Sequence, residues 1–157
     1  MEYAFGKIVK SIKKLSDTDP QLRIQLQKYC YDIQGCCQEV HRDMGPFLNE
    51  YIYQDALDMC FEEHGIVGED KQKEYYFTPQ FHGKNIRHPH KVDFLIRNKV
   101  FVECKAIDHL GPEQRQQLWN YMRLTGIRIG FLYNFAPIMD ECERYYYDPD
   151  IQVMYMW

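Results

Sequence analysis

Residues 92–105 read VDFLIRNKVFVECK and predict two β-strands joined by a tight turn. Val, Ile and Phe dominate both halves of this stretch and favour extended structure, while Asn98 is typical of the turn between them. The strands should cover residues 92–97 and 100–107. Because an aspartate, a glutamate and a lysine interrupt these apolar halves, the hairpin is also the first place to look for chemistry.

The length of the turn decides which residues of the hairpin face each other. If residues 97–99 form a three-residue loop, Ile96 pairs with Val100 and Asp93 falls opposite Glu103 on the same face. A two-residue turn would instead bring Asp93 opposite Cys104. The register of the hairpin is therefore itself a prediction.

The two-residue period of a strand separates the side chains of the second half onto two faces. One face carries Phe101, Glu103 and Lys105; the other carries Val100, Val102, Cys104 and Ala106. Two carboxylates directly opposite each other destabilise a sheet unless something compensates them, and a divalent cation held by oxygen ligands would do so. Lys105 could then orient or polarise a metal-bound water. The alternative is an exposed sheet face with a simple Glu103–Lys105 pair.

Asp93, nine intervening residues and then Glu103-Cys104-Lys105 resemble the D-x9-E-x-K signature of the PD-(D/E)XK nuclease superfamily. Residues 45–53, GPFLNEYIY, resemble the segment that names the GxxExxY family, a small bacterial branch of that superfamily. Glu50 and Tyr53 match its Glu and Tyr, whereas Phe47 stands where the family has Gly.

A third motif follows the hairpin. Residues 117–121, QLWNY, are similar to the QxxxY motif of the RecB-like nucleases, with Gln117 and Tyr121 four residues apart on one helix face. Gln114 stands where relatives often carry a His. The resemblance covers about residues 29–137.

The resemblance implies an αβββαβ core and a nuclease that acts on DNA with Mg²⁺ or Mn²⁺. Asp93 and Glu103 would hold the ion together with the backbone carbonyl of Cys104, and Lys105 would position the attacking water. Glu50 would complete the metal shell or bind a second ion. The remaining candidates would brace the site or contact the nucleic acid; they are Gln117, Tyr121, Tyr53, Arg87 and Lys91.

Charge argues against a strong nucleic-acid binder. Nineteen Lys and Arg against twenty-three Asp and Glu leave a formal net charge of -4, whereas backbone binding usually leaves a basic footprint. A local exception precedes Asp93, where the basic side chains are Lys84, Arg87, His88, His90 and Lys91. The amino-terminal lysines form a second basic patch, and a DNA contact would depend on such local clusters.

Length and composition fit a single domain. The chain has 157 residues, of which 45% are hydrophobic and 27% charged, enough for a sizeable core. We expect a helical extension over residues 1–20, the family core over 29–137 and a final strand or tail over 138–157. The first residues lack the apolar core of a secretory signal, and no apolar run is long enough to cross a bilayer, so a cytoplasmic location is expected.

The six cysteines lack C-x-x-C pairs and predict free thiols in a reducing compartment. One alternative is a zinc site, because Cys30, Cys37 and His41 share a face of a predicted helix. The simpler interpretation is that these residues are interior positions of an amphipathic helix.

The remaining pattern predicts helices first, then antiparallel strands, then a helix and further strands. Helices are expected within residues 1–16 and over 21–44, 47–64 and 112–126. Strands are expected over 74–81, 86–90, 127–135 and, interrupted by a turn at residues 148–150, over 145–157. This order favours an α/β or α+β fold with one mixed sheet and a restriction-endonuclease-like core.

Two functions of different classes remain. The first is a metal-dependent deoxyribonuclease that hydrolyses phosphodiester bonds. The second is a catalytically silent nuclease-like module for binding or assembly, either a homodimer through Tyr-rich surfaces or a subunit of a larger DNA-processing or defence complex. The acidic pair with its lysine favours the enzyme, and the acidic net charge favours the module.

Overall fold

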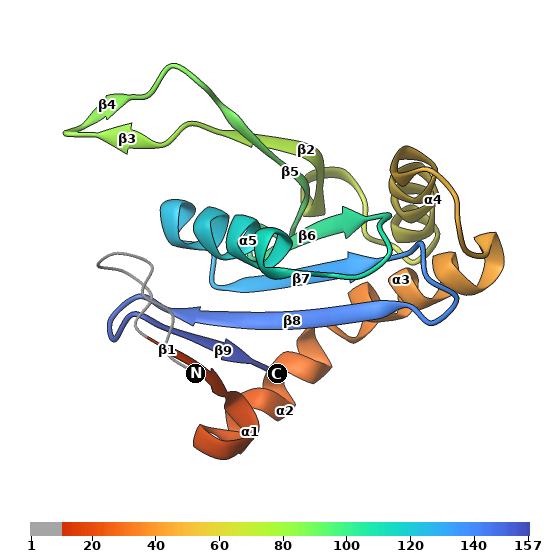
Figure 1. Cartoon of the computed structure of the whole chain (residues 1–157), viewed down its shortest axis with the longest axis horizontal. Coiled ribbons are helices and arrows are strands. Elements are labelled where there is room, and N and C mark those ends of the chain that lie inside the picture. Colours follow the sequence, from red (N-terminus) through yellow and green to blue (C-terminus); the bar gives the residue numbers. More distant parts are fainter. Residues whose placement is uncertain (1–10) are drawn as a thin grey trace.

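The computed structural model describes residues 11–157 as a mixed β-sheet with helices on both faces (Figure 1). The helices are α1 Leu15–Thr18, α2 Pro20–Tyr29, α3 Tyr31–Met44, α4 Glu50–Glu63, the short 3-10 helix η1 Gly68–Asp70, and α5 Pro112–Thr125. The strands are β1 Ser11–Lys14, β2 Lys71–Phe77, β3 Gln80–Phe81, β4 Lys84–Asn85, β5 His90–Ile96, β6 Val100–Lys105, β7 Ile129–Asn134, β8 Glu141–Asp148 and β9 Val153–Met156. The predicted mixed α/β fold is confirmed.

Seven strands form the main sheet in the order β1-β9-β8-β7-β6-β5-β2, and β3 and β4 form a separate ribbon. The pairs β6–β7 and β1–β9 are parallel, and the other neighbours in the sheet are antiparallel. Two adjacent parallel strands need a long crossover, and α5 supplies it between β6 and β7. The middle of the sheet is therefore covered on both sides, and β7 is buried along its whole length.

The alternation of side chains along β6 divides the interior into two clusters. Val100, Val102 and Cys104 pack in the cluster that α2, α3 and α4 cover, whereas Phe101 packs with residues of α5 on the other face. The two faces predicted from the sequence are thus confirmed, and Glu103 and Lys105 follow Phe101 on the α5 side. None of the helices described in residues 11–157 combines the length and the apolar character needed to cross a bilayer.

The hairpin has the register of the three-residue loop. Ile96 pairs with Val100, and Arg97 and Asn98 make the turn with positive φ values of 53° and 55°. The paired residues of β5 and β6 end at Phe94 and Val102. One step further the strands diverge, and Asp93 and Glu103 lie at that point.

Two predictions for the N-terminal part were wrong. Ser11–Lys14 form β1, not a helix, because they pair with β9 and extend the sheet at its edge; residues 1–10 lie outside the described part of the chain. The helix expected over residues 21–44 is broken at Cys30, between α2 and α3. Leu26 of α2 and Ile33 of α3 both pack in the same cluster.

Two strand boundaries were also misjudged. The final segment contains a turn near Pro149, as predicted, but the strand before it starts at Glu141 and pairs with β7. The strand expected over residues 74–81 consists of β2 and the short β3.

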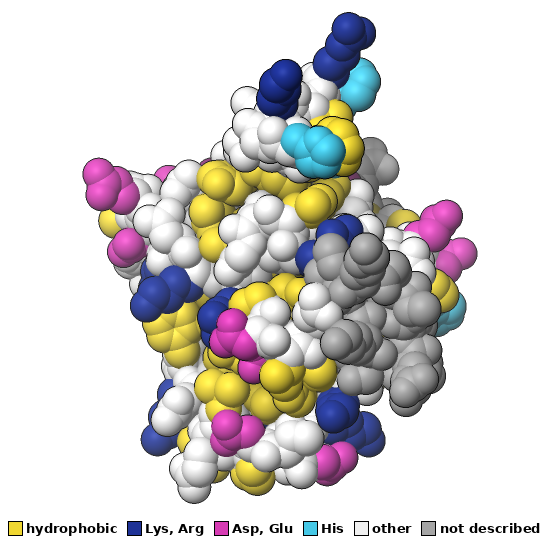
Figure 2. All heavy atoms as spheres, turned by 90° about the vertical axis from the view of Figure 1, so that its left-hand side faces the viewer, with side chains coloured by type: hydrophobic (Ala, Val, Ile, Leu, Met, Phe, Trp, Pro, Cys, Tyr) yellow, Lys and Arg dark blue, Asp and Glu magenta, His cyan; other side chains and the backbone are white. Residues whose placement is uncertain are grey.

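An arm projects from the sheet where β2 and β5 continue beyond the other strands (Figure 1). Its tip is the β3–β4 ribbon, whose turn contains Gly83 with a φ of 76°. Residues 80–91 are all exposed. The arm therefore offers its polar and basic side chains to solvent, and Figure 2 shows dark blue and cyan side chains gathered on it at the top of the view.

Candidate active site

Asp93 and Glu103 lie inside the protein where β5 leaves β6. Their exposed fractions are 9% and 4%. An Asp93 carboxylate oxygen accepts a hydrogen bond from the Cys104 N–H at 2.8 Å, and a Glu103 carboxylate oxygen accepts one from the Asp93 N–H at 3.0 Å. Both carboxylates thus accept hydrogen bonds from backbone N–H groups where the regular pairing of β5 and β6 ends. These bonds orient each acid toward the neighbouring strand.

The protein environment disfavours the charged forms of Asp93 and Glu103. Burial raises the pKa of Asp93, although the hydrogen bond from Cys104 opposes the shift. Burial, followed by the charge of Asp93, raises the pKa of Glu103. Two acids that resist ionisation together are stabilised in the charged form by a nearby cation, so the arrangement favours binding of a positive ion.

Lys105 joins this pair to helix α5. Its ammonium nitrogen lies 3.5 Å from a Glu103 carboxylate oxygen and donates a hydrogen bond of 2.8 Å to the side-chain oxygen of Gln117. Tyr121 is buried one turn after Gln117, and burial followed by the charge of Glu103 raises the pKa of its hydroxyl. Four side chains predicted from separate motifs therefore meet: Glu103, Lys105, Gln117 and Tyr121.

Helix α4 reaches the same place from the opposite face of the sheet. Gln54 donates a hydrogen bond of 3.1 Å to the second carboxylate oxygen of Asp93. Glu50, one turn earlier, is exposed, yet partial desolvation and then the charge of Asp93 raise its pKa, while Lys105 and Lys91 lower it. Among the described residues, Glu50, Asp93 and Glu103 do not form a group with all ligand atoms within 4.8 Å. Glu50 thus influences the acidic pair through its charge in this arrangement.

Comparison with known proteins identifies the family. Residues 27–145 match the family described as the PD-(D/E)XK nuclease superfamily. The chain belongs to this superfamily. No curated protein matched the sequence. Among solved structures, the one described as "Crystal structure of SSO0001" is similar to this chain with a TM-score of 0.43 and 16% identity, covering 83% of this chain and 58% of that one. This chain thus spans less than two thirds of the length of that protein.

The donor set fits the divalent metal that PD-(D/E)XK nucleases typically use. Asp93 and Glu103 offer hard oxygen ligands, which Mg²⁺ and Mn²⁺ prefer. Their raised pKa values reflect charge that the protein itself leaves poorly compensated. The residues present therefore suit a hard cation.

Tyr53 has a different place from the other predicted residues. It is fully buried in the cluster below α4 and stacks on Phe135 with ring centroids 5.0 Å apart. Its hydroxyl donates to the Gly45 carbonyl at 2.7 Å and accepts from the Leu48 N–H at 3.0 Å. Tyr53 therefore braces the segment that leads into α4 and has no surface through which to touch a substrate.

Phe47 lies in that braced segment with a φ of 65°, a backbone conformation that favours Gly. Phe47 holds this conformation while its N–H donates to the Ala136 carbonyl at 3.0 Å. A non-glycine residue here leaves local strain beside α4 and exposes an aromatic ring, which is 73% accessible.

The basic candidates lie on and near the arm. Arg87 and Lys91 are exposed, and Lys91 lies 3.4 Å from a carboxylate oxygen of Glu74. At the base of the arm, His90 contacts the ring of Tyr121 with centroids 5.8 Å apart. The arm therefore begins directly beside the acidic pair.

Gln54 and His90 were not among the predicted site residues. Gln54 follows Glu50 by four residues, so the helical period could have suggested it. His90 precedes Asp93 by three residues in a cluster already noted for its positive charge. The sequence could not show that Gln54 contacts β5 or that His90 contacts α5, because both contacts join separate elements.

The zinc site considered for Cys30, Cys37 and His41 does not form. His41 instead contacts the Pro137 carbonyl at 2.8 Å. The group that comes together within the described residues consists of Cys36, Cys60 and His64. The simpler interpretation, interior positions, agrees with Cys30 and Cys37, which are 1% and 0% exposed, although Cys30 lies in the break before α3.

Proposed function

We propose that this chain is a metal-dependent nuclease of the GxxExxY type that hydrolyses phosphodiester bonds of DNA. The observation that carries the proposal is the buried pair Asp93 and Glu103, with Lys105 held beside it by Gln117. A domain that only bound a partner would gain nothing from burying two acids with raised pKa values. In this proposal the catalytic core spans about residues 29–137 of one domain.

Asp93 and Glu103 would hold Mg²⁺ or Mn²⁺, with the backbone carbonyl of Cys104 as a further ligand. The bound ion would lower the pKa of a coordinated water and offset the charge that develops on the phosphate. Gln54 keeps Asp93 oriented through its hydrogen bond, so the metal-binding rotamer is set before the ion arrives.

Lys105 would orient the attacking water and stabilise the phosphate oxygens. Its contact with Gln117 limits the positions that its ammonium group can take, which favours one productive geometry. Glu50 would act through a metal-bound water or a second ion, since it is exposed and coupled to Asp93 by charge. Tyr121 would brace Gln117 from the core side.

DNA would lie along the arm. Arg87 and Lys91 are exposed there, together with Lys84, His88 and His90, and these side chains suit contacts to phosphate oxygens. A local basic arm beside an acidic metal site explains how a chain with a net charge of -4 could hold DNA.

The test is cleavage of linear, nicked, circular and single-stranded DNA with Mg²⁺ or Mn²⁺. Glu103→Ala and Lys105→Ala should each reduce the rate by roughly 100-fold or more, since each removes a group that acts on the reacting atoms. Glu69→Ala and Lys28→Ala remove exposed residues of the same types and should leave the rate unchanged.

Equal background cutting by all five proteins would overturn the enzyme and leave the silent binding or assembly module as the explanation. Sedimentation of the same samples would then show whether the chain forms a homodimer. Far-UV circular dichroism of each variant checks that it has folded.

A further inference from the structure

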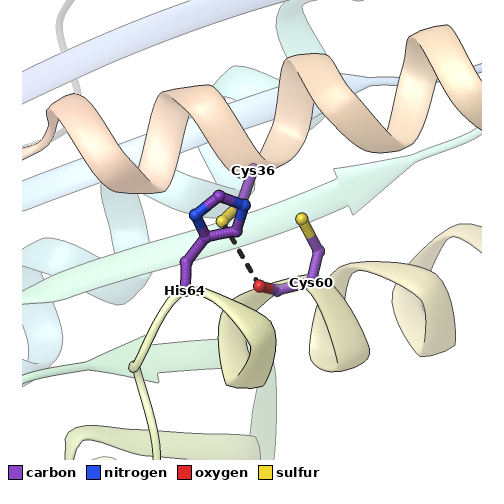
Figure 3. Close-up of side chains that lie close together, drawn as sticks. All are labelled: Cys36, Cys60 and His64. Carbon is purple, nitrogen blue, oxygen red and sulfur yellow. Dashed lines mark hydrogen bonds between the residues drawn. The ribbon is translucent and has the colours of Figure 1, made fainter.

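Donor side chains of α3 and α4 converge at the end of α4 that is distant from Glu50. The ligand atoms of Cys36, Cys60 and His64 all lie within 4.8 Å of one another. Figure 3 shows Cys60 and the ring of His64 directed from the end of α4 toward Cys36 on α3, with a hydrogen bond between the Cys36 thiol and the Cys60 carbonyl. Two thiols and one imidazole in such proximity are a combination typical of zinc centres.

A fourth donor, Glu39, contacts two members of this group. A carboxylate oxygen of Glu39 lies 2.7 Å from the Cys60 sulfur and 3.4 Å from Nε2 of His64. Glu39 follows Cys36 by three residues, and His64 follows Cys60 by four. Each helix therefore contributes two donors from one face, because residues three and four apart are neighbours on a helix.

We propose that Cys36, Glu39, Cys60 and His64 form a tetrahedral site for a zinc-type ion that fastens α3 to α4. This site is separate from the acidic pair of the proposed nuclease centre and shares no residue with it.

Two separations among the donors can be compared with those of such a site. Two ligands about 2.0–2.2 Å from a tetrahedral ion lie about 3.4 Å apart, close to the His64–Glu39 distance of 3.4 Å. A thiolate at about 2.3 Å would lie about 3.6 Å from the same carboxylate oxygen. The Cys60–Glu39 contact of 2.7 Å would therefore have to lengthen, which a rotation of the partly exposed Glu39 side chain allows.

Two of the four donors are buried and two are accessible to solvent. Cys36 and Cys60 are 1% and 5% exposed, whereas the side chains of His64 and Glu39 are 49% and 32% exposed. A groove of about 410 Å³ between α3 and α4 includes Glu39 and Cys60 in its wall. An ion can enter from this side, and four protein ligands then leave no coordination position for a substrate.

The competing explanation is a metal-free network in which the Cys36 thiol bonds the Cys60 carbonyl and the Cys60 thiol bonds Glu39. The network satisfies the thiols, but it does not require a histidine beside them. His64 ends the helix within reach of both sulfurs and the carboxylate, and this fourth component favours the ion.

The test measures metal content and spectrum of the full chain. Protein purified without added metal and then dialysed against Zn²⁺ should retain about one zinc per chain by mass spectrometry. Replacement by Co²⁺ should produce the strong visible bands of tetrahedral cobalt and a near-ultraviolet thiolate-to-cobalt band. Absence of these bands in the wild-type chain would overturn the proposal without any variant.

Variants then assign the ligands. Cys60→Ser and His64→Ala should weaken zinc binding by roughly 100-fold. The matched controls are Cys142→Ser, a cysteine on β8, and His109→Ala, which removes a histidine that lies 3.1 Å from Glu141 and outside the proposed site. Control proteins should bind zinc like the wild type; equal zinc affinity in all five proteins would refute the assignment.

If Cys60→Ser fails to fold, Glu39→Gln provides the same test from an exposed position. It keeps the size of the side chain and removes the charge of the ligand. The nuclease assay uses different residues and a different metal, so failure of zinc binding and failure of DNA cleavage can be told apart.

Discussion

The two ends of helix α4 border groups of opposite chemistry. Near its start, Gln54 contacts Asp93, and the donors there are the carboxylate oxygens of Asp93 and Glu103. Near its end, the donors are two thiols, an imidazole and one carboxylate. The first group offers few protein ligands and suits an ion that keeps its waters, whereas the second can enclose an ion fully. The type and number of ligands therefore distinguish the proposed reactive centre at Asp93 and Glu103 from the proposed structural site at Cys60 and His64.

Helix α4 also connects the two groups mechanically. An ion bound at Cys60 and His64 would hold the end of the helix whose other end orients Asp93 through Gln54. The proposed zinc would thus stabilise the helix without taking part in the chemistry.

The largest expected effect comes from Asp93→Asn. The amide can still accept the hydrogen bond from Cys104, but the charge needed for Mg²⁺ is lost, so DNA cleavage should fall by about 1,000-fold. Zinc content should stay at the wild-type value, because Asp93 is not among the proposed zinc ligands. Kinetics and metal analysis of one preparation measure both quantities.

If Asp93→Asn cleaved DNA at a rate within tenfold of wild type, Asp93 would not be a ligand of the catalytic metal, and the proposed division between a reactive and a structural site would be wrong. The melting temperature of Asp93→Asn should equal or exceed that of wild type, since the substitution removes a like charge beside Glu103. This measurement separates a lost ligand from a damaged fold.

An intermediate effect is expected from pH. The pKa of Glu103 is raised to about 8, so in the metal-free protein its carboxyl group holds its proton at pH 6 and loses it as the pH rises. The stability that the protonated form contributes is present below the ordinary pKa and is lost on passing through pH 8. Mg²⁺ must displace this proton, so its affinity should increase by up to about tenfold per pH unit from pH 6 to 8.

Titration calorimetry at three pH values in this range checks the dependence. Glu103→Gln should flatten it, because the amide has no proton to lose. Mg²⁺ should also raise the melting temperature of the wild type more at pH 8 than at pH 6. An affinity for Mg²⁺ that did not change with pH would contradict the proposed ligands.

The smallest effect concerns the arm. Arg87→Ala should weaken DNA binding a few-fold and lower the slope of log affinity against log salt by about one, as expected for one lost phosphate contact. Binding of both metals should be unchanged. Arg23→Ala on α2, which lies on the other side of the molecule from the arm (Figure 1), is the matched control.

Fluorescence anisotropy with labelled DNA at several salt concentrations gives these slopes. Equal slopes for both variants would remove the arm from the proposed DNA-binding surface.

The sequence was a good guide to the hairpin and a poor one to the edges of the sheet. The apolar alternation and Asn98 restricted the hairpin to two registers, because strand period and turn length are local properties, and the structure has the one that pairs Ile96 with Val100. Ser11–Lys14 look like part of an amphipathic helix, but pairing with β9 provides hydrogen bonds that no local pattern encodes.

What the amino-acid order determined by itself is the inventory of the proposed nuclease centre: an acid on each hairpin strand, a lysine two residues on, and a glutamine and tyrosine one helical turn apart. Tertiary structure decided which distant groups join them. Gln54 reaches Asp93 because α4 packs against the sheet, and Cys36 meets Cys60 and His64 because α3 and α4 pack side by side. Spacing along one element follows from backbone geometry, whereas contact between elements follows from how their apolar faces pack.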